Sequence, residues 1–428
     1  MLAAVRAGES ATPALARVDA ALRPGTQALA FQSLRYLGRA EALRGLLAKR
    51  PPPPAADALL CTALALTWDQ DDAPYEAFTL VDQAVEAAKR DPATQGQANF
   101  INACLRRFLR ERALLVAASD RDPVARWNHP RWWIDRLRTD HPGQWEALLQ
   151  ANNAQPPMTL RVNARKMPRD GYLQTLAAAN LGATPVGTDG VILEEPQPVH
   201  QIPGFDAGLV SVQDQAAQMA APLLLAGLQG DGRPLRVLDA CAAPGGKTAH
   251  LLEIADLDLT AIDVDAGRCE RIHETLERIG LEARVVTADA AKPATWWDGN
   301  PFDAILLDAP CTASGIVRRH PDVRWLRRET DIAQLAAQQA RLLDALWPLV
   351  RTGGRLLYCT CSVFRAEGEA RIQTFVTHHT EAVLLPSPGH MLPRSGAKGD
   401  SVPDNRVSDH DGFFYALLEK NSASVGQA

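Results

Sequence analysis

The feature that most constrains the fold is a repeated alternation of short apolar runs and helical runs in the second half of the chain, from about residue 206. The runs at 235–239 and 259–263 have the length of buried strands, and a segment with helical spacing follows each of them. Three more strands are expected at 283–289, 302–308 and 355–360. Because strands that alternate with helices pair in parallel, we predict a doubly wound α/β sheet whose ligand lies at the carboxyl ends of the strands.

The chain changes character twice before this sheet. Up to about residue 120, apolar residues recur at helical spacing, as in 80–88 and 100–109, which predicts an all-α bundle. A Trp-rich, proline-punctuated piece follows, with short β-like runs at 158–162 and 190–193, which predict a small α/β linker module. We therefore expect domains at 1–125, 126–205 and 206–420, and a flexible tail at 421–428.

Charge and hydropathy exclude several classes of protein. The 45 Lys and Arg residues stand against 50 Asp and Glu, so a globally basic nucleic-acid binder is excluded, although a local basic groove is not. No apolar run approaches the roughly 18 residues of a membrane helix, and Arg6, Glu9 and Arg17 interrupt any signal-peptide core. We expect a soluble, cytoplasmic monomer that does not bind membranes.

The seven cysteines do not indicate a disulfide framework or a metal site. Their number is odd, and no C-x-x-C pair occurs. We predict no bound metal.

Four of the expected strands end in a carboxylate. These residues are Asp239, Asp263, Asp289 and Asp308. An aspartate after a strand is also an ordinary turn residue, but four of them at one edge of a parallel sheet favour a bound ligand. Asp263, after the second strand, is placed to accept hydrogen bonds from ribose hydroxyls.

A glycine-containing turn links the first of these strands to its helix. The turn reads Cys241, Ala242, Ala243, Pro244, Gly245, Gly246, Lys247, Thr248. It lacks both the dinucleotide fingerprint G-x-G-x-x-G and the first glycine of a P-loop, so a nucleoside-bearing ligand without an anchored pyrophosphate fits better. S-adenosylmethionine has that form. Lys247 either touches the ligand or caps the turn.

Two cysteines follow neighbouring strands close to these acids. Cys311 follows Asp308 by three residues, and Cys361 follows the fifth strand. Their position beside a nucleoside pocket suggests thiolate chemistry, although buried apolar thiols are the commoner fate of cysteine. Cys359 is interpreted as a packing residue.

Several arginines are candidate RNA contacts. The run at 318–328 contains five arginines and one aspartate, and we predict that Arg318, Arg319 and Arg324 contact phosphates. Arg106 and Arg107 belong to a basic helix face that either binds RNA or is simply solvated. In the stretch 126–138, we interpret the Trp side chains as packing residues and leave the Arg side chains open.

Three motifs together resemble the signature of RNA cytosine-C5 methyltransferases. They are 239–248 with its Pro-Gly-Gly turn, Asp-Ala-Pro-Cys at 308–311, and Thr-Cys-Ser at 360–362. The helical front, with Asn-Ala-Cys-Leu-Arg-Arg-Phe at 102–108, resembles the antitermination factor NusB. The resemblance runs over nearly the whole chain, to about residue 415, and implies a Rossmann-like methyltransferase domain that uses S-adenosylmethionine on a cytosine of small-subunit (16S) ribosomal RNA.

The resemblance also implies roles for individual residues. Cys361 is implied to be the nucleophile that adds to C6 of cytosine, and Cys311 is implied to assist release of the product. The residues implied to contact S-adenosylmethionine are Cys241, Ala242, Ala243, Pro244, Gly245, Gly246, Lys247, Asp263, Asp289 and Asp308.

Two other classes of function remain to be weighed. A nicotinamide-dependent dehydrogenase would need the missing dinucleotide fingerprint, and it would leave Cys311 and Cys361 without a role. A non-catalytic RNA-binding or antitermination protein would not need the thiols and the strand-end acids; binding of S-adenosylmethionine discriminates between it and the enzyme.

Overall fold

Residues 1–71, 73–230, 232–393 and 409–422 are described by the computed structural model. The chain divides into two units, one formed by residues 1–155 and 317–329 and the other by residues 156–316 and 330–428. The boundary after Gln155 falls inside the segment 126–205 that the sequence assigned to a single module. The domain limits at 125, 205 and 420 stay predictions, and residues 423–428 of the expected tail lie outside the described residues.

The first unit is an all-α bundle arranged around α5 (Pro54–Thr67), which confirms the predicted helical front. Pro54 begins this helix, where its missing N–H costs nothing. The helix is apolar on nearly every side, as a central helix must be, and it contacts α1, α3, α4, α6 and α7. The other helices of this unit are α1 (Leu2–Arg6), α2 (Ala11–Ala16), α3 (Arg23–Arg35), α4 (Leu37–Leu47), α6 (Ala77–Arg90), η1 (Gln95–Gln97), α7 (Ala98–Ser119), α8 (Pro123–Trp127), α9 (Arg131–Asp140), α10 (Trp145–Asn153) and α16 (Val323–Leu326).

The segment 317–329 belongs to this helical unit, although it lies far along the chain. The indole N–H of Trp325 donates to the carbonyl oxygen of Leu34 at 2.8 Å. Asp322 accepts from the backbone N–H of Ala11 at 2.8 Å and from the hydroxyl of Ser10 at 3.2 Å. The arginine-rich run is therefore integrated into the packing of the bundle.

The second unit begins with a small antiparallel sheet. Its strand order is β2-β3-β1-β4, and the central strands β1 (Met158–Val162) and β3 (Gly190–Leu193) lie where the sequence predicted them. The remaining elements are β2 (Ala183–Val186), β4 (Val210–Val212), α11 (Arg169–Ala178) and η2 (Val199–Gln201). Tyr172 and Leu176 of α11 are fully buried in the apolar core that this sheet forms.

A seven-stranded sheet forms the rest of the second unit, with the order β10-β11-β9-β8-β5-β6-β7. The five strands from β9 to β7 are parallel, as predicted, and β10 and β11 add an antiparallel edge that the sequence did not predict. The strands are β5 (Leu235–Ala240), β6 (Leu257–Asp263), β7 (Arg284–Thr287), β8 (Phe302–Asp308), β9 (Val350–Thr360), β10 (Ala382–Met391) and β11 (Phe413–Lys420).

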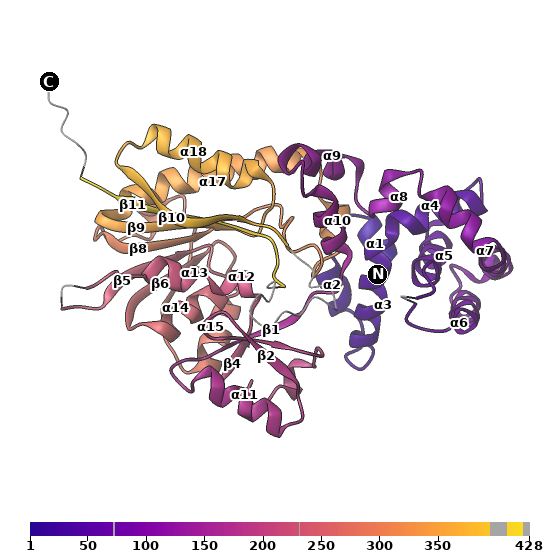
Figure 1. Cartoon of the computed structure of the whole chain (residues 1–428), viewed down its shortest axis with the longest axis horizontal. Helices are drawn as coiled ribbons and strands as arrows, with labels where there is room; N and C mark the ends of the chain where they lie inside the picture. Colours follow the sequence, from indigo (N-terminus) through magenta and orange to yellow (C-terminus); the bar gives the residue numbers. More distant parts are fainter. Residues whose placement is uncertain (72, 231, 394–408, 423–428) are drawn as a thin grey trace. The chain divides into compact units, whose positions relative to one another are not determined.

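Helices cover both faces of this sheet (Figure 1), and the strands between its two edge strands, β10 and β7, are apolar on both sides. Neighbouring residues of β5 show the alternation: Val237 packs with the helices α13 to α15, and Leu238 packs with α17 and α18. The helices and turns are α12 (Gln215–Gln218), α13 (Ala220–Leu225), α14 (Gly246–Ile254), α15 (Ala266–Ile279), η3 (Pro293–Thr295), α17 (Glu329–Leu346), η4 (Trp347–Leu349), η5 (Arg365–Glu367) and α18 (Glu369–His378). In this architecture a ligand binds at the carboxyl ends of the parallel strands, which the helices on the two faces do not cover.

Candidate active site

The parallel register brings the predicted acids to one edge of the sheet. Ala240 of β5 pairs with Ile262 of β6 and with Leu307 of β8, so Asp239, Asp263 and Asp308 end neighbouring strands. Asp289 lies two residues beyond the end of β7. The arrangement is the crevice that a doubly wound sheet offers to a ligand.

The glycine turn between β5 and α14 adopts a backbone that its small residues permit. Gly245 has φ +95°, and a Cβ there would lie 3.1 Å from the Cα of Ile272 in α15. Cys241 also has a positive φ of 63°. The backbone N–H of Ala243 donates to the Asp263 carboxylate at 3.1 Å, which ties the turn to the neighbouring strand.

Asp239 is a buried carboxyl beneath this turn. The hydroxyl of Thr248 donates to its Oδ2 at 2.6 Å, whereas its Oδ1 has no hydrogen-bond partner among the described residues. Burial raises the pKa of Asp239 to about 7. Burial, followed by the nearby carboxylates Asp308, Asp263 and Asp239, also raises the pKa of the Cys241 thiol, which keeps that thiol protonated.

Lys247 and Asp308 form an ion pair within the candidate site. The Nζ of Lys247 lies 2.7 Å from Oδ2 of Asp308 and 5.4 Å from the centre of the Phe413 ring. Burial alone would lower the pKa of Lys247, but the Asp308 carboxylate, together with the nearby Cys359 and Cys361, outweighs burial and raises that pKa. The lysine therefore stays charged and fixes Asp308 at the end of β8, a role that neither sequence-based interpretation of Lys247 included.

The two predicted active-site thiols face each other. The Sγ atoms of Cys311 and Cys361 are 3.4 Å apart. Cys361 is partly exposed and Cys311 is buried. The hydrogen bond to Cys361, burial and the nearby Glu367 carboxylate raise the pKa of Cys311 well above its ordinary value. The Cys311 thiol is thus kept protonated.

Cys359 occupies the position that its packing interpretation predicted. It is fully buried in the core of the sheet, and it is the register partner of Asp308. Burial raises the pKa of this thiol as well.

Glu367 is a buried carboxylate of this site that the sequence analysis missed. It lies in η5, six residues after Cys361, and accepts hydrogen bonds from residues beside both thiols. The one signal in the sequence was an acid in the short turn that follows Thr-Cys-Ser, which resembles any solvated turn residue.

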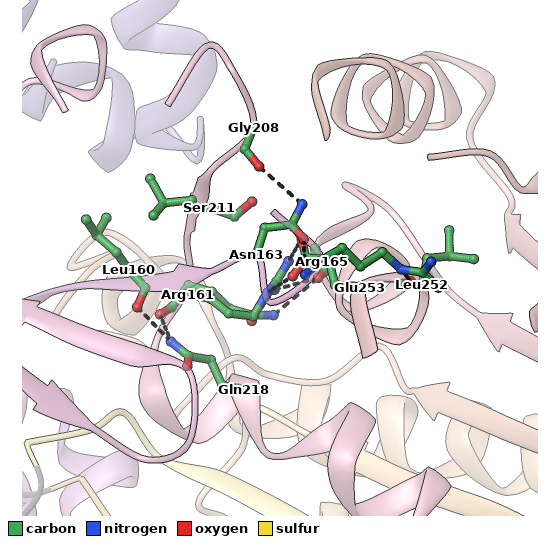
Figure 2. A network of polar contacts seen from close by, with 12 residues as sticks. Leu160, Arg161, Asn163, Arg165, Gly208, Ser211, Gln218, Leu252 and Glu253 are labelled. Carbon is green, nitrogen blue, oxygen red and sulfur yellow. Dashed lines mark hydrogen bonds and ion pairs between the residues drawn. The ribbon is translucent and has the colours of Figure 1, made fainter. Parts of the chain in front are cut away.

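A second unpredicted group, Arg161 of β1, reaches from the small sheet to the helix that follows the glycine turn (Figure 2). Its Nε and Nη2 donate to the two carboxylate oxygens of Glu253 in α14, at 2.8 and 2.9 Å. Its Nη1 donates to the carbonyl oxygen of Gly246 at 3.0 Å and to the side chain of Gln213. One buried side chain therefore holds both the first residue and the last turn of α14.

Neighbouring residues extend this network. Arg165 donates to the carbonyl oxygen of Leu252 at 2.6 Å and forms an ion pair of 2.7 Å with Asp256. The amide of Asn163 donates to the carbonyl oxygen of Gly208 at 3.2 Å (Figure 2). The polar contacts of Arg161 and Arg165 thus tie the small sheet to α14 on the cofactor side of the large sheet.

The predicted RNA-binding role of Arg318 and Arg324 is wrong, because both side chains are fully buried. Arg324 donates to the backbone carbonyl oxygens of Asn128 and Asn152 and to the side chain of Asn153. Burial, with a smaller contribution from Arg35, lowers the pKa of Arg324 to about 9. The buried guanidinium joins segments of the bundle and cannot contact a phosphate from this position.

The other candidate RNA contacts stay predictions. Arg319 is partly exposed. Arg106 is exposed and donates to Asn102 at 3.0 Å, and Arg107 forms an ion pair of 3.1 Å with Glu111. The buried Trp127 and Trp133 confirm the packing interpretation for those two side chains.

The described part of the chain contains neither a candidate metal site nor a candidate membrane-spanning helix. Among its His, Cys, Asp and Glu residues, no group of three or more could hold a metal ion. None of its helices combines the length and the apolar character that a membrane crossing requires.

The residues at the sheet edge fit S-adenosylmethionine. Its ribose hydroxyls and its ammonium group are hydrogen-bond donors, and this edge offers carboxylate oxygens at the ends of several strands. Asp289 and Asp308 are partly exposed, and each oxygen of Asp263 can accept more than the one contact it makes to the backbone. The small side chains of 242–246 let a ligand approach the backbone.

Comparisons with known proteins agree with this chemistry. Residues 227–419 match the family described as 16S rRNA methyltransferase RsmB/F, and residues 129–200 match the ferredoxin-like domain of RsmF/B-like methyltransferases. "Ribosomal RNA small subunit methyltransferase B" of Pseudomonas putida is 43% identical over 99% of this chain and 98% of its own length. The protein of the same name from Vibrio vulnificus is 38% identical over 97% of this chain and 96% of its own.

Solved structures show a similar fold. The crystal structure of PH0851 has a TM-score of 0.75 and 25% sequence identity, over 98% of this chain and 97% of that chain. NSun6 from Pyrococcus horikoshii, solved with SFG, has a TM-score of 0.57 and 20% identity, over 68% of this chain and 98% of that chain.

Proposed function

The chain belongs to the 16S rRNA methyltransferase RsmB/F family, and from this premise we propose that it methylates C5 of a cytosine in small-subunit ribosomal RNA through a covalent bond between Cys361 and C6. The enzyme depends on S-adenosylmethionine, which supplies an electrophilic methyl group when it is bound. The observation that carries the proposal is the pair of thiols 3.4 Å apart at the edge of the sheet.

A thiolate is needed because C5 of cytosine is a weak nucleophile. Addition of the Cys361 sulfur to C6 moves the electron pair of the C5–C6 double bond toward C5, which can then take up the methyl group. Loss of the C5 proton to a base restores the double bond. The electron pair of the S–C6 bond returns to Cys361, and the methylated base is released.

The difference in burial supports the division of labour between the two thiols. Cys361 is partly exposed, so the target cytosine can reach it, whereas Cys311 is buried and protonated. A protonated Cys311 can donate a hydrogen bond to the sulfur of Cys361 and stabilise it as it leaves C6. We therefore assign the attack to Cys361 and assistance in product release to Cys311.

The strand-end groups support a cofactor site. We propose that Asp263 and Asp289 accept from the hydroxyl and ammonium donors of S-adenosylmethionine and that Asp308 contributes from β8. The proposed backbone contacts come from the turn residues Cys241, Ala242, Ala243, Pro244, Gly245, Gly246 and Lys247.

We propose contacts to RNA outside the active site from arginines whose side chains are at least partly exposed. Arg319, Arg106 and Arg107 remain the proposed phosphate contacts after the exclusion of the two buried arginines. We expect the protein to act as a monomer in the cytoplasm.

Replacement of each thiol tests the proposal. Cys361→Ala should form no adduct and no product, because the attack on C6 is lost. Cys311→Ala should accumulate a complex of enzyme and methylated RNA that survives denaturing electrophoresis, because release is slowed. The measurement uses transcribed 16S ribosomal RNA with labelled S-adenosylmethionine.

Cys359→Ala provides a matched control, since this third thiol is buried and packs in the sheet. It should trap nothing. Trapping in Cys361→Ala and none in Cys311→Ala would make Cys311 the nucleophile and contradict the assignment.

A further inference from the structure

A single buried carboxylate connects the two segments that carry the thiols. Glu367 is fully buried. It follows Cys361 by six residues along the chain and lies against the segment that contains Cys311. Burying a carboxylate is costly unless its oxygens are hydrogen-bonded, so the contacts of this group indicate what it holds in place.

The two oxygens of Glu367 are satisfied by four neutral donors. Its Oε1 accepts from the backbone N–H of Thr312 at 2.9 Å and from the amide of Gln339 at 3.2 Å. Its Oε2 accepts from the hydroxyl of Thr312 at 2.5 Å and from the hydroxyl of Ser362 at 2.6 Å. Thr312 follows Cys311 and Ser362 follows Cys361, so the carboxylate binds the residue next to each thiol.

The two segments do not depend on Glu367 equally. Cys361 follows directly from β9, whose residue Thr360 pairs with Phe414 of the neighbouring strand. The segment of Cys311 is a loop, and Ala313 within it has a positive φ of 59°, which is unfavourable for alanine. Two of the four hydrogen bonds to Glu367 come from Thr312, between Cys311 and this strained residue.

We propose that Glu367 is a positioning residue that holds the loop of Cys311 against Cys361, so that the buried thiol can assist release of the product. This inference rests on the proposed function, in which Cys311 acts in release. The charge of Glu367 acts in the same direction, because it contributes to the raised pKa of Cys311 and so helps to keep that thiol protonated.

The inference predicts that loss of Glu367 reproduces the defect of Cys311→Ala with both thiols present. Glu367→Ala removes all four acceptor contacts and should slow product release by about tenfold or more, so that a denaturation-resistant adduct with 16S ribosomal RNA accumulates. Binding of S-adenosylmethionine, measured by calorimetry, should stay unchanged. A defect that only destabilised the fold would lower adduct and product together.

A conservative variant separates geometry from packing. In Glu367→Gln the amide oxygen can still accept from Thr312 N–H and Gln339, and the hydroxyls of Thr312 and Ser362 can turn to accept from the new NH₂ group. This variant should therefore recover most of the release rate. Thr312→Val removes a single hydroxyl without emptying the core, and it should trap an intermediate amount of adduct even if Glu367→Ala does not fold.

Glu369→Ala is the matched control. Glu369 lies two residues further along the chain, is half exposed, and pairs with Arg365 at 3.7 Å. It should release product at the wild-type rate. Trapping in Cys311→Ala, with none in folded Glu367→Ala or in Thr312→Val, would overturn the role of Glu367 alone. Absence of trapping in Cys311→Ala itself would overturn the proposed role of Cys311, and with it this inference.

Discussion

Arg161 and Glu367 are both fully buried charges in the second unit, and they are satisfied in different ways. Arg161, on the cofactor side, faces the carboxylate of Glu253 with two parallel hydrogen bonds, so the two charges compensate each other. Glu367, on the thiol side, is held by two hydroxyls, an amide and a backbone N–H, all neutral.

The two arrangements differ in how they respond to mutation and to a change in pH. An ion pair in the interior is rigid, and it becomes costly when one partner is removed, because the other charge is left buried and alone. The stability of a buried carboxylate that is held by neutral donors depends instead on whether the carboxylate is itself protonated. Burial raises the pKa of Glu367, and the hydrogen bonds from Ser362 and Thr312 oppose that rise. We expect the cofactor side to respond most strongly to mutation and the buried acids to respond to pH.

The largest effect is expected from Arg161→Met. This variant leaves Glu253 buried without its partner, and the free energy of unfolding at pH 7 should fall by about 3–5 kcal/mol. Chemical denaturation of the purified protein measures the change. Arg165→Met is the control: its partner Asp256 is 88% exposed, and the loss should be about 1 kcal/mol or less.

The double variant Arg161→Met with Glu253→Met sharpens the comparison. Replacing both members of a buried pair by apolar residues removes the isolated charge and should recover most of the lost stability. A double variant as unstable as Arg161→Met would show that the contact of Arg161 with Gly246, and not the ion pair, carries the stability.

A pH-dependent effect is expected from Asp239→Asn. The folded-state pKa of Asp239, about 7, lies above its ordinary value of 3.8, so the folded protein binds this proton more tightly than the unfolded chain does. The stability that this proton contributes is present below about pH 4 and is lost as the pH rises through 7, at up to about 1.4 kcal/mol per pH unit.

The free energy of unfolding of wild type minus that of Asp239→Asn should therefore decrease from pH 4 to pH 7 and then level off. Denaturation at a series of pH values, without cofactor, measures this difference. A difference that stayed constant over the window would show that Asp239 is ionised at low pH in the folded protein.

The parallel strands and the site at their ends could be predicted from the sequence because local patterns specify them. Apolar runs of strand length, each closed by an aspartate or a cysteine, define both the strand and its chemical end. The edge strand β10 could not be predicted in this way. It contains Pro386, Pro388 and Gly389, which are typical of a loop. It pairs with β11 on both sides of a register shift between Leu385 and Gly389.

The burial of charged residues is the second feature that could not be predicted from the sequence. Arg324 appears in a basic run typical of a phosphate-binding surface, yet its acceptors come from residues 128, 152 and 153, which are remote in the chain. Arg161 and Glu367 are single charged residues, and the fold brings remote partners to each: Glu253 to Arg161, and Thr312 and Gln339 to Glu367. Charge is visible in a sequence, but burial depends on tertiary contacts.

The most direct test of the account uses 16S ribosomal RNA transcribed with 5-fluorocytidine in place of cytidine. A fluorine on C5 cannot leave as the proton does, so the bond between enzyme and C6 should persist after methyl transfer. Proteolysis and mass spectrometry of the adduct then identify the attached residue. The account predicts an RNA fragment joined to the sulfur of Cys361 in the wild-type enzyme. Attachment to Cys311, or no adduct from an enzyme that methylates ordinary RNA, would contradict it.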